Sequence, residues 1–99
     1  MEAEFEILEE RGVHAVLFQL KETPGILRSE LYRKMEMKGV GDVTIIKRVN
    51  KLISAGLIRW EQSSTHKKGQ YLFLTKSGED VVEHLGRIKH IMEVKENDQ

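Results

Sequence analysis

The segment from Asp42 to Ile58, DVTIIKRVNKLISAGLI, constrains the fold more than any other stretch of the chain, because its hydrophobic period changes at a glycine. Before Gly56, residues of one kind recur at the three- and four-residue steps that share one side of an α-helix, whereas the sequence after it is typical of an extended strand. Gly56 supplies the left-handed conformation that ends a helix, and Leu57 can fold back onto the last turn in a Schellman motif. We therefore predict a helix over residues 42–55, followed directly by a strand.

The two sides of this predicted helix differ in chemistry. Positions i, i+3, i+4 and i+7 form one polar and cationic stripe, which consists of Thr44, Lys47, Arg48 and Lys51. The same spacing one residue later gives an apolar side, formed by Ile45, Val49 and Leu52 and widened by Ile46 and Ile53. One side is thus suited to packing, and the other offers positive charge.

Two further helices are expected before this one. Apolar residues at helical spacing predict helices over 12–22 and 28–37, separated by the breakers Thr23-Pro24-Gly25 and followed by Lys38-Gly39-Val40-Gly41. Asp42 is the residue type that caps the next helix. The first three helices together would bury one small core.

Two aromatic and β-branched runs, 57–62 and 70–75, flank a polar and basic loop over 63–69 and predict a hairpin. The sequence Ser77-Gly78-Glu79-Asp80 then offers a capping start to a last helix. The apolar seam of that helix consists of Val81, Leu85, Ile88 and Met92. A body of this size does not easily cover so long a stripe.

The charges are unevenly distributed, although the formal net charge is zero. The first ten residues contain five acids and no base, residues 28–76 contain eleven bases against four acids, and residues 77–99 contain six acids against three bases. The middle of the chain therefore carries about +7 between acidic ends. A local positive surface of this kind attracts polyanions, which makes nucleic acid a candidate partner.

The length and composition favour one domain. With 99 residues we expect an acidic, helical extension over 1–11, a winged helix-turn-helix-sized core domain over 12–76, and a C-terminal helix and tail over 77–99 as a dimerisation element. The absence of cysteine removes disulfides, thiol catalysis and cysteine zinc sites. No run is long and apolar enough for a membrane helix, and the acidic start is unlike a signal peptide, so we expect a cytoplasmic protein.

The order helix, helix, turn, helix, hairpin is that of a winged helix-turn-helix, an α+β, mainly α fold with a three-helix core, a β-hairpin wing and here a C-terminal helix. The segment LISAGLIRW resembles the end of the recognition helix in small prokaryotic regulators, and YLFLTKSGEDV resembles the sequence after their wing. The resemblance spans about residues 12–85 and points to the broad MarR, PadR and HxlR-like group. It implies a sequence-specific double-stranded DNA-binding protein that regulates transcription and is not an enzyme.

This resemblance assigns roles to individual residues. The helix over 42–55 would enter the major groove, where Arg48 and Lys47 can donate to guanine and Thr44 and Ile46 can touch a thymine methyl. The other predicted DNA contacts are mainly to phosphates and comprise Lys51 on that helix, Arg28 and Ser29 at the start of the second helix, Arg59 on the hairpin, and Lys67 and Lys68 at the wing tip.

The C-terminal seam predicts a homodimer. Val81, Leu85, Ile88 and Met92 would meet a second copy, with Phe5, Ile7 and Leu8 packing near them. A twofold axis would set two recognition helices about 34 Å apart and favour a pseudo-palindromic operator.

The predicted fold is also compatible with other classes of function. A winged helix can also serve as a protein-interaction module in a larger assembly, and a double-stranded RNA binder is a third possibility. The wing aromatics Trp60, Tyr71 and Phe73 are interpreted as structural. Asp80 with His84 and His90 with Glu93 have spacings that suit a shared ion, but without further ligands we predict no metal site, no cofactor and no catalytic residues, and the sequence does not identify an effector.

Overall fold

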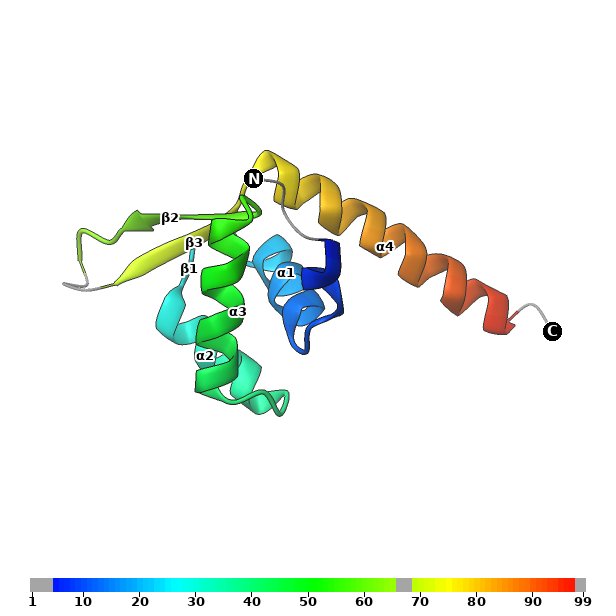
Figure 1. Cartoon of the computed structure of the whole chain (residues 1–99), viewed down its shortest axis with the longest axis horizontal. Helices are drawn as coiled ribbons and strands as arrows, with labels where there is room; N and C mark the ends of the chain where they lie inside the picture. Colours follow the sequence, from blue (N-terminus) through cyan, green and yellow to red (C-terminus); the bar gives the residue numbers. More distant parts are fainter. Residues whose placement is uncertain (1–4, 66–68, 98–99) are drawn as a thin grey trace.

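The computed structural model describes residues 5–65 and 69–97, and its core lies where three helices meet a small sheet. The elements follow in the order η1 (Phe5–Glu9), α1 (Val13–Glu22), β1 (Ile26–Leu27), α2 (Arg28–Met37), α3 (Asp42–Ser54), β2 (Ile58–Gln62), β3 (Gln70–Leu74) and α4 (Lys76–Asn97). Figure 1 shows the hairpin of β2 and β3 and the far end of α4 projecting in opposite directions from the helices between them. The winged helix-turn-helix fold predicted from the sequence is confirmed.

The core is built from the apolar faces of α1, α2 and α3. Its fully buried members include Val13, Val16, Leu17 and Leu20 of α1, Leu31 and Met35 of α2, and Ile45, Val49 and Leu52 of α3. Ile7 of η1 and Val82 of α4 close it from the two ends of the chain. Burial of these side chains is the main force that holds the helices together.

The sheet has one strand more than the predicted hairpin. Its order is β1-β3-β2, and both pairs are antiparallel, with Ile26 opposite Leu72 and Trp60 opposite Leu72 on the other side. The strand β1 has only two residues, too few for an alternating pattern to be visible in the sequence. It nevertheless positions the site, because it ties the start of α2 to the base of the wing.

The end of α3 has the predicted Schellman geometry. Gly56 has φ 78°, its amide donates to Ile53 O at 3.0 Å, and the amide of Leu57 donates to Leu52 O at 3.0 Å. These two bonds satisfy carbonyls that a helix end would otherwise leave unpaired. The glycine stop is thus confirmed, and it turns the chain directly into β2.

The start of α4 is capped by a different residue from the one predicted. Thr75 accepts a hydrogen bond on Oγ1 from the Gly78 amide at 3.0 Å, so the cap lies two residues before Ser77. The same hydroxyl donates to Gly56 O at 2.6 Å, and the Thr75 amide donates to Leu57 O at 3.0 Å. The last turn of α3 and the first turn of α4 are therefore joined through Thr75, which no local pattern could reveal.

Gly78 allows this junction to close. A Cβ built on it would lie 2.1 Å from Leu57 O, so any side chain would force the backbone apart. The two sequence marks of the resemblance, around Gly56 and around Gly78, thus meet in space. The N-cap prediction for Asp42 was also wrong: Gly41 occupies the cap position without a side-chain bond, and Asp42 is the first helical residue. There its carboxylate still complements the helix dipole.

Candidate nucleic-acid interface

The helix α3 stands at the front of the domain with one side fully buried and the opposite side free (Figure 1). Because Ile45, Val49 and Leu52 face the core, the residues on the far side are those at positions 43, 47 and 50. Val43 is 70% exposed, and Lys47 and Asn50 are also exposed. We call Val43, Lys47 and Asn50 the outer strip.

The predicted cationic stripe is rotated away from this outer strip. Of its four residues only Lys47 lies on the strip, Thr44 is half-buried, and Arg48 and Lys51 lie on the flank of α3 that faces the N-terminal segment. Ile46, on the opposite flank, is 38% exposed. Val43 and Asn50 were not among the residues predicted to contact DNA. Both lie about half a turn from the centre of the buried face, so helical spacing could have identified them.

Glu10 holds the two cations on the flank. Its carboxylate pairs with Arg48 Nη1 at 3.1 Å and with Lys51 Nζ at 2.9 Å, and Arg48 Nε donates to Arg11 O at 3.0 Å. The hydrogen bond from Lys51, together with the charge of Arg48, lowers the pKa of the Glu10 carboxyl. Two of the predicted DNA contacts are therefore engaged by the chain itself.

The opposite edge of the outer strip is bordered by Arg28 at the start of α2. Its Nη2 donates to Asn50 Oδ1 at 3.3 Å, and its Nε is buried without a hydrogen-bond partner in the described part of the chain. Gln70 Oε1 is likewise buried and unpaired among the described residues, and the pairing of Leu27 with Tyr71 brings Gln70 close to Arg28. Arg28 thus fixes the orientation of the Asn50 amide, and Ser29 beside it is exposed.

Nearby, Tyr32 lies one helical turn after Arg28, and burial raises the pKa of its hydroxyl, while Arg28 partly offsets the effect.

Fewer of the predicted contacts can be located on the wing. Lys67 and Lys68, predicted at its tip, lie outside the described residues. Trp60 is 46% exposed, so it packs on the helices only in part. The interpretation of the wing aromatics as purely structural is therefore incomplete for this residue.

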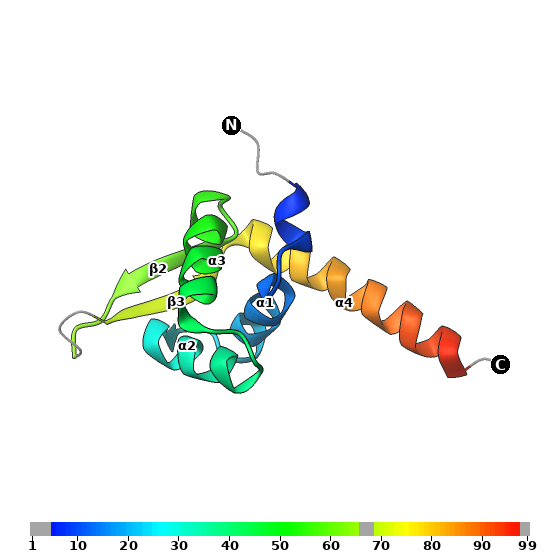
Figure 2. The same cartoon turned by 60° about the horizontal axis from the view of Figure 1, so that its bottom comes forward.

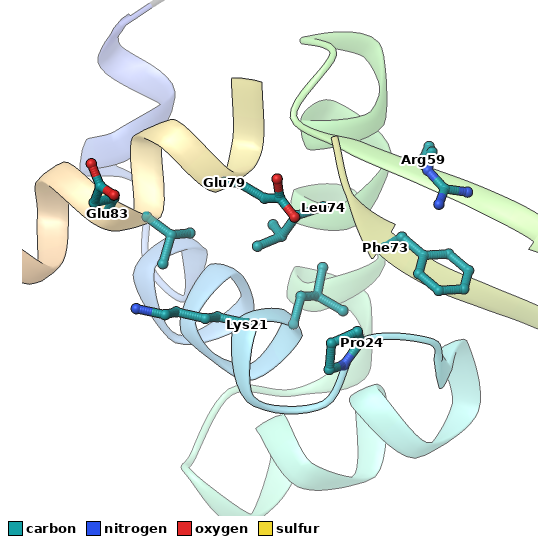
Figure 3. Close-up of a pocket in the computed structure, with 9 residues that line it drawn as sticks. Lys21, Pro24, Arg59, Phe73, Leu74, Glu79 and Glu83 are labelled. Atoms are coloured by element: carbon teal, nitrogen blue, oxygen red, sulfur yellow. The ribbon is translucent and has the colours of Figure 1, made fainter. Parts of the chain in front are cut away.

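Arg59 lies in a different environment from the outer strip. Its guanidinium stacks over Phe73 at 4.3 Å from the ring centre and pairs with Glu61 at 2.6 Å. Figure 3 shows it at the edge of a cavity of about 360 Å³, which is also lined by Lys21, Pro24, Glu79 and Glu83 from α1, the following loop and α4. The structure therefore does not bring Arg59 to the strip.

The predicted dimerisation residues divide into two groups. Val81 and Leu85 pack partly against the core, whereas Ile88 and Met92 are 54% and 65% exposed on α4. With Phe5 and Leu8 of η1, Val81, Leu85 and Ile88 line an almost wholly apolar groove of about 610 Å³. Figure 2 shows α4 continuing past α1, away from the rest of the domain.

One of the two spacings considered for a metal ion, Asp80 with His84, is occupied by other bonds. His84 Nδ1 lies 2.9 Å from Asp80 O, and the Asp80 carboxylate pairs with Lys76 at 2.9 Å. Within residues 5–65 and 69–97, no three potential ligands gather closely enough to hold an ion. No helix in the same part of the chain combines the length and apolar character needed to cross a membrane.

Solved structures of MarR-type regulators share this fold. FabT from Streptococcus pneumoniae, solved in complex with DNA, has a TM-score of 0.77 at 20% identity over 90% of this chain and 60% of that one. A MarR protein from Peptoclostridium difficile has a TM-score of 0.73 at 26% identity, over 94% and 60% of the two chains. The PcaV regulator from Streptomyces coelicolor, solved with its natural ligand, has a TM-score of 0.73 at 27% identity, over 86% and 59%.

The chain thus spans about three fifths of the length of these solved structures. No protein-family model and no curated protein sequence matches it. The resemblance to winged helix-turn-helix regulators of the MarR group, inferred from two short sequence motifs, is confirmed at the level of the fold.

Proposed function

We propose that the chain is a sequence-specific double-stranded DNA-binding protein that regulates transcription, with α3 in the major groove and the wing on the backbone. The observation that carries this proposal is the outer strip of Val43, Lys47 and Asn50, which stands clear of the core beside the start of α2. A protruding helix is the shape that the major groove admits. The positive charge of residues 28–76 and the fold shared with FabT, solved with DNA, support the same proposal.

The outer strip suits base reading. Lys47 can donate to guanine O6 and N7, and Val43 and Ile46 can contact a thymine methyl group. Because Arg28 donates to Asn50 Oδ1, the Asn50 amide nitrogen remains as a donor, which matches the N7 acceptor of a purine. We therefore add Asn50 to the predicted readers and give Arg28 the further role of orienting it.

The remaining predicted contacts are proposals for the backbone. Ser29 lies at the exposed start of α2, where amide groups favour an anion, and Thr44 borders the outer strip. Lys67 and Lys68 are assigned to phosphates by the resemblance alone. Arg48 could serve in the same way by exchanging Glu10 for a phosphate, and the more exposed Lys51 is paired with the same carboxylate.

Selection from a random-sequence duplex library tests the proposal. The wild-type chain should enrich a half-site with a purine at one position, and Asn50→Ala should lose that preference at a cost of about 1–3 kcal/mol on the selected site. The effect on random DNA should be small. Lys89→Ala on α4, which lies outside the proposed interface, is the control for general effects of the expressed variants. Failure of the wild-type protein to enrich any sequence would remove the proposal of specific recognition.

Arg28→Ala distinguishes two roles for that residue. If Arg28 orients Asn50, its loss should relax the same base position as Asn50→Ala, and the double variant should be no worse than either single one. If it contacts a phosphate, its loss should weaken binding to all sequences and shallow the salt dependence by about 0.9 units. For the wing, Lys67→Ala with Lys68→Ala should shallow that slope by up to about two units.

We further propose that the protein acts as a homodimer in the cytoplasm. The dimer is supported by the groove between η1 and α4 and by the exposed apolar side chains Ile88 and Met92, which continue its apolar side along α4 with Ile91 beside them. In such a dimer two α3 helices would lie about one turn of DNA apart, roughly 34 Å. Light scattering at micromolar concentration should give twice the chain mass for the wild type.

Two variants that each add one carboxylate to α4 test the dimer as a matched pair. Ile88→Asp places it on the apolar seam and should yield a monomer, while His90→Asp places it on the opposite side of α4 and should not. A wild-type protein that is monomeric at all concentrations contradicts the dimer and its palindromic operator together. DNA binding by one copy would remain open to the selection experiment.

A protein-interaction module is not favoured. Of the solved structures named above, PcaV is described as a transcriptional regulator, and FabT was solved with DNA. Competition between DNA and RNA duplexes of equal length addresses the remaining class, since an A-form helix offers no comparable major groove to α3.

A further inference from the structure

The residues that join η1 to α1 also fasten the flank of the recognition helix. Glu10 pairs with both Arg48 and Lys51, which lie 38 and 41 positions later in the chain. The next residue, Arg11, accepts from Arg48 Nε at 3.0 Å and donates through Nη2 to Gly39 O at 2.9 Å. Four contacts thus hold a two-residue segment against α3 and the turn before it.

These contacts compete with nucleic acid for the same groups. Arg48 and Lys51 lie on the flank of α3 next to the outer strip, where a helix in the major groove passes the phosphate backbone. A carboxylate that accepts from a guanidinium and an ammonium makes the same kind of charge-assisted bonds that a phosphate would make. The Arg48 side chain is only 20% exposed, so its guanidinium cannot meet a phosphate fully without leaving Glu10.

The place of Glu10 depends on the N-terminal segment that precedes it. Ile7 of η1 is 7% exposed in the core, and Leu8 packs against the core while lining the apolar groove beside α4. The position of the carboxylate is therefore set by the same short helix that forms one wall of the groove.

We propose that Glu10 is a positioning residue of the nucleic-acid interface, which withholds Arg48 and Lys51 from the backbone so that binding relies on the outer strip. The inference rests on the proposed DNA binding. Arg48, whose side chain is 20% exposed, meets a phosphate fully only when the carboxylate releases it, whereas Lys51 is 58% exposed and has its charge offset by the same carboxylate. Binding to unselected DNA, which depends on backbone charge, is thereby kept weak relative to binding at a site that Lys47 and Asn50 can read.

Glu10→Gln tests this, because it keeps the size of the side chain and removes its charge. The matched control is Glu6→Gln, which makes the same change in net charge on an exposed residue of η1 without an ion pair in the described part of the chain. Affinity for a random-sequence duplex is measured over a range of potassium chloride concentrations. Glu10→Gln should bind more tightly than the control, and its plot of log affinity against log salt should be steeper by about one to two units.

A double-variant cycle identifies the path of the effect. In a protein that already carries Arg48→Ala and Lys51→Ala, Glu10→Gln should change neither affinity nor slope beyond the control. Glu10→Asp, which retains the carboxylate, should stay near the wild-type slope. A purely structural role would instead lower the melting temperature and the affinity of Glu10→Gln together while leaving the slope unchanged.

The outcomes separate the inference from the function on which it rests. Equal slopes for Glu10→Gln and Glu6→Gln, with clear binding by both, overturn the role of Glu10 alone. Weaker binding by Glu10→Gln than by the control overturns it as well. If the wild type and all variants bind no duplex at any salt concentration, DNA binding itself fails and the inference fails with it.

Discussion

The two halves of α4 have similar apolar spacing but different surroundings. In the first half Val82 is 1% exposed, and the helix start is joined to the end of α3 through Thr75 and Gly78. In the second half Ile88, Ile91 and Met92 are 54–65% exposed. A hydrophobic seam therefore predicts that one side of a helix is covered. It does not predict whether the same chain or another molecule covers that side.

A charge introduced into each half should have the most unequal effect. Val82→Asp would leave an unpaired carboxylate in the core and should reduce the free energy of unfolding by at least about 3 kcal/mol. Met92→Asp, at a seam side chain that is 65% exposed, should change it by no more than about 0.5 kcal/mol in the dilute monomer. Urea unfolding at several protein concentrations measures both. Equal costs would mean that the second half belongs to the folding unit of the single chain.

The two glycines of α4 should respond to alanine in opposite directions. Gly78→Ala would push a Cβ against Leu57 O and should destabilise the protein by about 1–3 kcal/mol. At Gly86 no atom lies within 4 Å of the added Cβ, so alanine should stabilise the helix by about 0.5–1 kcal/mol. Thermal unfolding gives the sign of each effect, and a stabilising Gly78→Ala would contradict the tight junction.

The identity of the helix cap can be tested at two neighbouring hydroxyls. Thr75→Ala removes the bond to the Gly78 amide and the bond to Gly56 O, and should cost about 0.5–2 kcal/mol. Ser77→Ala should cost less than about 0.5 kcal/mol, because Ser77 is exposed within the first turn. The reverse order in chemical unfolding would restore Ser77 as the cap.

The smallest expected effect is an electrostatic one at the start of α4. The hydrogen bond from Lys76 to Asp80, at 2.9 Å, raises the pKa of the ammonium above its ordinary value of 10.5. Since the pKa is higher in the folded state, the pair stabilises the fold below about pH 10.5 and its contribution is lost as the pH rises through the folded value. Titration of Lys76 by nuclear magnetic resonance should show the raised pKa, and Asp80→Asn should remove most of the shift, because Glu79 and Glu83 contribute only the smaller part.

Local signals predicted the regular elements well. The span of α2 is that expected from its apolar steps, and the end of α3 follows from Gly56 and Leu57. They failed where a structure depends on distant residues. No local sequence pattern around Ile26 predicts a two-residue strand. The cap of α4 is recognised only from the hydrogen bond between Thr75 and Gly56, which are distant in the sequence.

The candidate site was predicted in part for a similar reason. Helical spacing shows which residues of α3 share a side, but grouping them by charge selected Arg48 together with Lys47, whereas the exposed side lies opposite Val49. Of the outer strip, the sequence analysis therefore included Lys47 and left out Val43 and Asn50. The ion pairs of Glu10 join residues 38 and 41 positions apart, and such separations leave no periodic trace in a single sequence.

Because Thr75 joins the start of α4 to the end of α3, a tilt of α4 at this junction is transmitted to α3. A helix of 22 residues is about 33 Å long, so a tilt of about 10° at its start displaces its far end by about 6 Å. Conversely, a molecule bound at the far end of α4 would change the orientation of α3 by a small angle for a large displacement of that end. In the proposed dimer, the distance between the two α3 helices would then depend on the angle at which the two α4 helices cross.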